Sequence, residues 1–310
     1  MTNISERQNE PENIKKLKAQ GQMYSDVKFL MVLTIVIGVG IPVTASFSIF
    51  ALGNYNLPNP VSFGKNYITH ISAVIGLLSA IGVLIINNFL KSLKEDAAKV
   101  QEMFDTRVFN LPWDNTNVGK KPDTGLIFRK SKKFDKRNSD YTGFKDWYTI
   151  KAAEFEYPRA IAFCQQQNLC WDSSLRNVVI IASTILLTLL LLTVFILGWL
   201  NDVSLRNFVT NFILLSLPIC IFFLNIIIEH KKTISEMERL REINKNLIDS
   251  TTSNNLPNDE FKSECRKLQT AIYNHRKTAR PIPDWLHRIY KNDHEEESAD
   301  RMQQYLNDHQ

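Results

Sequence analysis

Cysteines and recognisable catalytic motifs are scarce in this sequence of 310 residues. There are four cysteines, and the spacing Cys164-x5-Cys170 matches no common zinc knuckle and has no histidine beside it. A nucleophile elbow, a Gly-rich phosphate loop and an HExxH motif are all missing, and the six histidines are scattered. We therefore expect no metal site, no cofactor and no catalytic residues, and the chain does not read as an enzyme.

Charge is missing from four long apolar stretches. They are Phe29–Gly53, Tyr67–Leu90, Asn177–Leu200 and Asn207–Ile228. Each is about the ~20 residues that cross a ~30 Å hydrocarbon core as a helix. One such stretch could be a buried core helix, but four predict four transmembrane helices. The first is too long and lies too far from the N-terminus for a signal peptide, so we expect it to be retained.

The missing intramembrane charges also exclude function classes. Pumps, proton-coupled carriers and voltage sensors work through ionisable side chains inside the membrane. Because four packed helices fill their own centre, a conducting pore would need several subunits, each turning a polar face inward. The candidate pore-lining residues are Thr184, Thr188, Asn211, Ser216 and Asn225. Alternatively, hydroxyl groups such as these hydrogen-bond along their own helix.

Lysine and arginine are distributed unevenly around the apolar stretches. They cluster before the first stretch, after the second and after the fourth, whereas the connections 54–66 and 201–206 carry only Lys65 and Arg206. By the positive-inside rule both termini and the long middle segment are cytoplasmic. The fold class is thus an all-α membrane protein. Its segments are a cytoplasmic N-terminal helix (1–28), a transmembrane hairpin (29–90), a cytoplasmic middle segment (91–176), a second hairpin (177–228) and a cytoplasmic helical C-terminus (229–310).

Local signals predict how the helices begin and end. Gly21 is a candidate break in the N-terminal helix, and "DTRVFNLPW" (105–113) has the pattern of an extended turn. Pro158 suits the first turn of a helix ending near Asn168, after which Asp172 or Ser173 would cap the third transmembrane helix. In a reducing cytoplasm the cysteines are expected to be packing residues rather than disulfides.

The cytoplasmic segments combine tryptophan and tyrosine with clustered lysine and arginine, most densely at 129–137. Such a composition could bind a phosphorylated nucleotide, since cations bind phosphate and aromatic faces stack on bases. Two alternatives stay open. For the 129–137 cluster, attraction to anionic lipid or simple solvation is favoured. For Trp113 and Trp171, core packing is about as well supported as ligand contact.

Five stretches together resemble one family. They are "AQGQMYSDVK" (19–28), "FDTRVFNLPW" (104–113), "DWYTI" (146–150), "CQQQNLCWDSSLR" (164–176) and "IYNHRKTARPIPDWLHRIY" (272–290). Their order around two membrane hairpins is similar to that of the SMODS-associated four-transmembrane effectors, over about residues 12–300.

The resemblance implies a pore-forming effector of bacterial anti-phage defence by cyclic-oligonucleotide signalling. A partner nucleotidyltransferase would make a cyclic di- or trinucleotide, which this chain would bind on the cytoplasmic side of the inner membrane. Homo-oligomers would then permeabilise the lipid bilayer and stop growth by abortive infection; no long nucleic acid is implied.

Within that scheme, we expect ligand contacts from Trp113, Arg159, Trp171, Arg176 and Arg276. Trp171, Asp172 and Arg176 stand where the middle segment enters the third transmembrane helix, so they are candidates for coupling ligand to membrane. The alternative functions are a membrane-anchored signalling adaptor without conduction and a membrane-bound nucleotide-processing enzyme.

Overall fold

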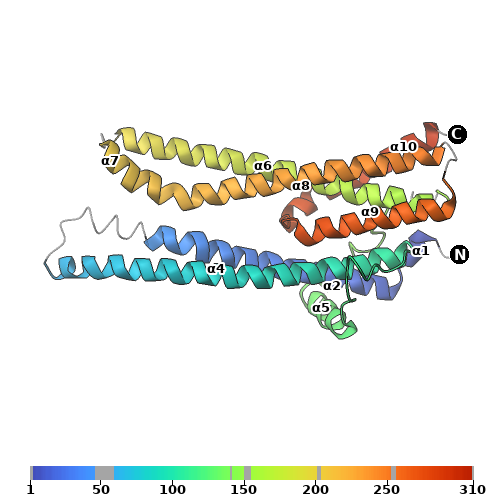
Figure 1. Cartoon of the computed structure of the whole chain (residues 1–310), viewed down its shortest axis with the longest axis horizontal. Helices are drawn as coiled ribbons and strands as arrows, with labels where there is room; N and C mark the ends of the chain where they lie inside the picture. Colours follow the sequence, from blue (N-terminus) through green and yellow to red (C-terminus); the bar gives the residue numbers. More distant parts are fainter. Residues whose placement is uncertain are drawn as a thin grey trace. The chain divides into compact units, whose positions relative to one another are not determined.

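A computed structural model describes residues 3–45, 59–139, 142–149, 155–200, 204–252 and 256–308, and for some residues inside these ranges, Trp171 and Asn211 among them, the backbone alone. All regular secondary structure in these ranges is helical (Figure 1). The elements are α1 (Ile4–Gln8), α2 (Pro11–Ile35), the π-helix η1 (Val36–Gly40), α4 (Asn59–Val108), α5 (Thr124–Arg137), α6 (Arg159–Leu200), α7 (Leu205–Phe208), the π-helix η3 (Val209–Ile213), α8 (Leu214–Thr252), α9 (Asn258–Thr278) and α10 (Asp284–Asp308).

The chain divides into two compact units. Unit 1 comprises Met1–Val27, Lys91–Val178 and His230–Gln310, and unit 2 comprises Lys28–Leu90 and Val179–Glu229. Unit 2 therefore holds most of the apolar stretches, whereas unit 1 holds nearly all the charged residues. The assignment of unit 1 to the cytoplasm stays a prediction from the lysine and arginine distribution.

Three described helices are long and apolar enough to cross a membrane: Pro11–Ala45, Ala73–Val108 and Arg159–Leu200. In each, only 6% of the most apolar window is buried within the protein, so the apolar side chains face outward as lipid contact requires. The fourth predicted span, Asn207–Ile228, runs through α7, η3 and α8 and includes side chains outside the described set. The prediction of an all-α membrane protein is confirmed.

Glycines allow close contacts inside unit 2. A Cβ on Gly38 would lie 2.9 Å from Val83, and one on Gly82 would lie 3.6 Å from Ile37, so α4 packs closely on η1. Near the turn between α6 and α7, a Cβ on Gly198 would overlap the Phe208 ring. Any larger residue at position 198 would require the Phe208 ring to move.

The core of unit 1 is built from segments far apart in the sequence. Phe104 of α4 is fully buried, and its ring lies 6.1 Å from that of Tyr148, which also packs on Phe109 at 5.1 Å. The same cluster draws side chains from the other helices, including Leu17, Ile161, Leu247, Phe261 and Met302. This cluster thus joins the N-terminus, the middle segment and the C-terminus within unit 1.

Helix α5 holds the whole basic cluster at 129–137. Its N-terminus is capped by Asp123, whose carboxylate accepts a hydrogen bond from Leu126 N–H at 3.2 Å. On the facing helix, the Asp26 carboxylate of α2 accepts hydrogen bonds from Lys130 (2.7 Å) and Lys133 (2.8 Å). Part of the basic cluster is therefore neutralised within the protein.

Three local predictions were wrong. Helix α2 runs through Gly21 without a break. Glycine at this position leaves room for the Phe144 ring, whose Cζ would lie 3.0 Å from a Cβ. Helix α4 continues through Asp105 to Val108, and the chain turns only at Asn110, with φ 51°. Helix α6 is continuous, so neither Asp172 nor Ser173 caps a separate helix. No glycine or proline interrupts residues 159–176, and the side chain of Asp172 bonds within α6 and to α9 instead.

Replacing Phe104 by alanine tests the core of unit 1. We expect Phe104→Ala to lower the free energy of unfolding by about 3–5 kcal/mol, because it leaves a cavity beneath Tyr148. The measurement is chemical denaturation in detergent, followed by far-UV circular dichroism. The matched control is Phe128→Ala, since the Phe128 ring is 51% exposed; equal losses for the two variants would contradict this description of the core.

Candidate functional site

A buried charge network joins α4 to α9. Asp105 of α4 is fully buried and accepts hydrogen bonds from Tyr148 Oη (2.6 Å) and Gln269 Nε2 (2.9 Å), and it forms an ion pair with Arg276. Glu102, one turn earlier, is equally buried; it pairs with Arg266 at 2.5 Å and accepts from Gln269 Nε2 at 2.9 Å. Two carboxylates of α4 thus face two arginines of α9, with Gln269 between them.

The network fixes the protonation states of Arg276 and Tyr148, whereas burial raises the pKa of Glu102 to about 7. Burial disfavours the charge on Arg276, yet the adjacent Asp105 carboxylate raises the pKa of that guanidinium above its usual value. Burial and the same carboxylate raise the pKa of Tyr148 well above 10. Tyr148 is therefore protonated and donates to Asp105, while Asn168 Nδ2 donates to the Tyr148 oxygen at 2.9 Å. This second bond extends the network to α6.

A second polar cluster ties α6, α8 and α9 together; we call Asp172, Arg176, His230 and His275 the junction cluster. The Arg176 guanidinium binds the Asp172 carboxylate through both oxygens, at 2.6 and 3.1 Å. His275 Nε2 lies 3.1 Å from Asp172 Oδ2, and because a carboxylate only accepts, that nitrogen carries a proton. Arg176 Nη1 lies 3.0 Å from His230 Nδ1 and donates to the carbonyl of Arg280 at 3.0 Å.

His230 is held neutral within the junction cluster. A guanidinium has only donors, so His230 Nδ1 accepts from Arg176 and the ring proton sits on Nε2. Burial, together with the charges of Arg176 and Arg280, lowers the pKa of His230 to about 4. A proton on Nδ1 would face the guanidinium directly and remove the hydrogen bond that Nδ1 accepts from Arg176. Protonation of His230 in acid would therefore break this contact of the junction cluster.

Comparison with known proteins assigns the chain to a family. The family described as SMODS-associating 4TM effector domain matches residues 2–305. The chain belongs to this family. It is also 30% identical, over 284 residues, to a Bacillus cereus (strain VD146) protein named a probable CBASS effector molecule; the match covers 91% of each chain. No solved structure matches it.

Family membership confirms the resemblance seen in the sequence and makes the chain a four-transmembrane effector. Of the five residues predicted to contact ligand, the four whose side chains the structure describes have different partners. Arg276 belongs to the α4–α9 network and Arg176 to the junction cluster. Trp113 donates from Nε1 to the Gly119 carbonyl at 2.8 Å, and Arg159 pairs with Glu156 at 3.6 Å. The Trp171 side chain lies outside the described set. Ligand contact by these residues stays a prediction.

The candidate pore-lining hydroxyl groups bond along their own helices. Thr184 donates to the Ile180 carbonyl at 2.8 Å, Thr188 to the Thr184 carbonyl at 2.9 Å, and Ser216 to the Ile213 carbonyl at 3.0 Å. Asn225 is exposed, and the Asn211 side chain is not described. The three hydroxyl groups thus hydrogen-bond along their own helices, as the alternative interpretation expects, and pore lining stays a prediction.

Sequence reasoning missed Glu102, Arg266 and Gln269 as site residues. A signal was present in α9, where Arg266, Gln269, Tyr273 and Arg276 follow at intervals of three, four and three and so share one face. Within the described residues, no group of three or more His, Cys, Asp or Glu side chains could hold a metal ion. All four cysteines are free thiols.

Removing one arginine tests the α4–α9 network. Arg276→Met leaves the buried Asp105 carboxylate without its cation, and we expect the free energy of unfolding to fall by about 3–5 kcal/mol. The double variant D105L/R276M should recover most of that loss, because it buries no charge. Chemical denaturation in detergent measures both. As a control, Arg301→Met removes an exposed pair with Glu297 and should cost less than about 1 kcal/mol; a similar loss for R276M and R301M would contradict the assigned network.

The low pKa of His230 predicts a loss of stability in acid. Between about pH 6.5 and pH 4 the unfolded chain binds a proton at His230 that the folded chain does not, so the free energy of unfolding falls as the pH is lowered through this range. The fall should reach about 2–3 kcal/mol near pH 4. In His230→Gln this contribution is absent, and unfolding curves at several pH values compare the two. Equal slopes for wild type and variant would show that His230 is not the group responsible.

Proposed function

We propose that the chain is an anti-phage effector that permeabilises the bacterial inner membrane when a cyclic di- or trinucleotide binds to it. The effector family and the relative named a probable CBASS effector support the role in defence. In this proposal a nucleotidyltransferase supplies the messenger, and several copies of the chain assemble around a shared path, because one four-helix chain fills its own centre.

The junction cluster is the observation that carries the proposal. Arg176 stands directly before the predicted third span, Asn177–Leu200, on the same continuous helix α6. His230 stands two residues after the predicted fourth span, Asn207–Ile228, on α8. A displacement of α9 would break the contact of His275 with Asp172 beside the start of the third span, and Arg176 links that contact to His230 beside the end of the fourth.

A ligand can open the membrane path only if it binds the open arrangement more tightly than the closed one. The junction cluster stabilises the closed arrangement, because its charge-assisted hydrogen bonds join groups of opposite charge and are largely buried. Ligand binding to unit 1 would then have to outweigh these contacts.

Dye release from proteoliposomes tests this function. Wild-type protein should release dye on addition of at least one member of a panel of cyclic di- and trinucleotides. Arg176→Met, which removes the centre of the junction cluster, should release dye without any nucleotide. Arg239→Met is the matched control, because Arg239 is an exposed arginine of α8 and should leave gating unchanged.

Other outcomes separate the alternative functions. An adaptor without conduction would release no dye with any nucleotide, although it would bind one. A nucleotide-processing enzyme would return the labelled nucleotide in altered form. Either result would contradict a gated, membrane-permeabilising effector.

A further inference from the structure

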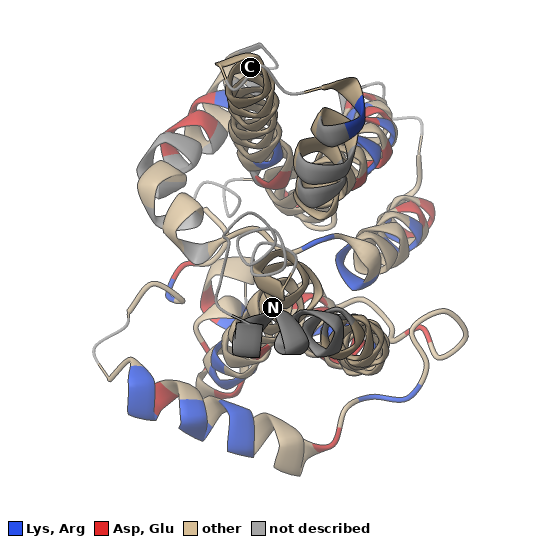
Figure 2. Cartoon of the chain, turned by 90° about the vertical axis from the view of Figure 1, so that its left-hand side faces the viewer, with Lys and Arg blue, Asp and Glu red and all other residues tan. Residues whose placement is uncertain are grey.

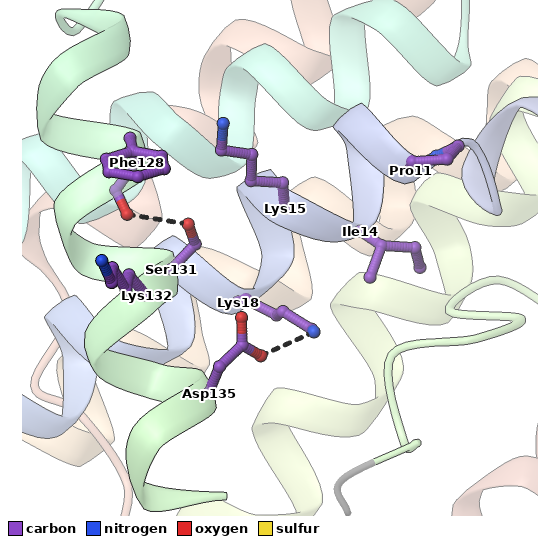
Figure 3. A pocket seen from close by; sticks show the side chains of 8 residues that line it. All are labelled: Pro11, Ile14, Lys15, Lys18, Phe128, Ser131, Lys132 and Asp135. Carbon is purple, nitrogen blue, oxygen red and sulfur yellow. Dashed lines mark hydrogen bonds and ion pairs between the residues drawn. The ribbon is translucent and has the colours of Figure 1, made fainter. Parts of the chain in front are cut away.

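A cavity of about 490 Å³ lies between α2 and α5 in unit 1. Lys15 and Lys18 line it from α2, and Phe128, Lys132 and Asp135 line it from α5 (Figure 3). The volume is within the range of ~300–1,000 Å³ that is usual for small-molecule sites. Helix α5, the lowest helix in Figures 1 and 2, carries a row of basic residues beside this cavity.

The Phe128 ring and two lysines form the most distinctive part of the cavity. The Nζ atoms of Lys15 and Lys132 lie 5.1 and 5.8 Å from the ring centroid. Phe128 is half exposed, whereas Ile127 and Phe134 of the same helix are buried in the core. A half-exposed aromatic ring therefore lies in the cavity, with a cation from each helix over it.

These two lysines differ from the arginines of the buried networks. Arg176 and Arg276 have carboxylate partners inside the protein, but within the described residues neither Lys15 nor Lys132 is in an ion pair. The neighbouring Lys18 pairs with Asp135 at 2.6 Å. Three amines against one carboxylate leave the cavity with excess positive charge, so it favours an anion.

We infer that this cavity binds a nucleotide, with a base stacked on Phe128 and phosphate groups on Lys15 and Lys132. Lysine amines bind phosphate as point charges, and every base has a face that can stack on an aromatic ring. The Asp135 carboxylate can accept a hydrogen bond from an amino group of the base. That the nucleotide is the cyclic messenger rests on the proposed function.

Contacts between α2 and α5 already hold the cavity in place, and α2 continues from the cavity into unit 2. Asp26 holds α5 on α2 through Lys130 and Lys133, and Ile127 packs beside Ala19 and Met23 of α2. Helix α2 continues to Ile35, so the residues that would bind phosphate share a helix with the start of the first predicted span. An anionic lipid headgroup offers the same phosphate chemistry but no base for Phe128, which favours a nucleotide.

Binding to the full-length protein in detergent tests the site. The probes are a panel of cyclic di- and trinucleotides, with tripolyphosphate as a phosphate without a base and dihexanoyl phosphatidylglycerol as a lipid headgroup; isothermal titration calorimetry gives each Kd. For any nucleotide that binds the wild type, K15Q/K132Q should raise Kd by about tenfold or more. K120Q/K145Q removes two exposed lysines of unit 1 outside the cavity and should leave Kd unchanged.

Variants of Phe128 separate stacking from charge. Phe128→Tyr keeps the aromatic face and should bind like the wild type, whereas Phe128→Leu keeps an apolar side chain and should raise Kd for the nucleotide by about tenfold. Tripolyphosphate binding should respond to K15Q/K132Q but not to Phe128→Leu. Circular dichroism and the thermal unfolding midpoint establish that each variant is folded.

The outcomes distinguish this site from the proposed function. If a nucleotide binds and triggers dye release while K15Q/K132Q and F128L keep the wild-type Kd, the cavity is not the site and the effector function stands. If these variants lose affinity for the lipid headgroup alone, the cavity binds lipid and the inference is overturned. If no nucleotide binds the wild type, the proposed function fails and the inference fails with it.

Discussion

The pairing of two buried carboxylates on α4 with two arginines on α9 organises unit 1. Glu102 and Asp105 have no access to water, and their oxygen atoms are paired with Arg266 and Arg276, with Gln269 donating to both side chains. Burying such pairs costs desolvation energy that an apolar core would avoid. What the pairing provides is register, because sliding α9 along α4 would leave a carboxylate without its partner.

Fixing α9 on α4 determines where its next residues lie. His275 and Arg276 are neighbours in sequence but belong to different networks: Arg276 binds Asp105 of α4, and His275 binds Asp172 of α6. Through Arg176 the second network reaches His230 of α8. Helix α9 thus contacts α4 and α6, which continue the two predicted hairpins within unit 1.

The fold class was predictable because burial in lipid leaves a strong sequence pattern. Apolar stretches of spanning length without charge are rare in soluble proteins. The lysine and arginine around them predict which side of the membrane each segment faces. The candidate site was less predictable. Asp105 was expected in a turn and Asp172 at a helix cap, since aspartate favours both positions. Their long-range partners, Arg276 and His275, outweighed that local preference.

The sequence by itself determined the helical content, the apolar stretches of spanning length and the effector family, because each depends on local composition or on a motif order that needs no contacts. Only the tertiary structure decided which charges are paired and which are available. Lysines at 15 and 132 and arginines at 176 and 276 are all cations on helices. Tertiary packing places a carboxylate beside each of the two arginines and a half-exposed aromatic ring beside the two lysines.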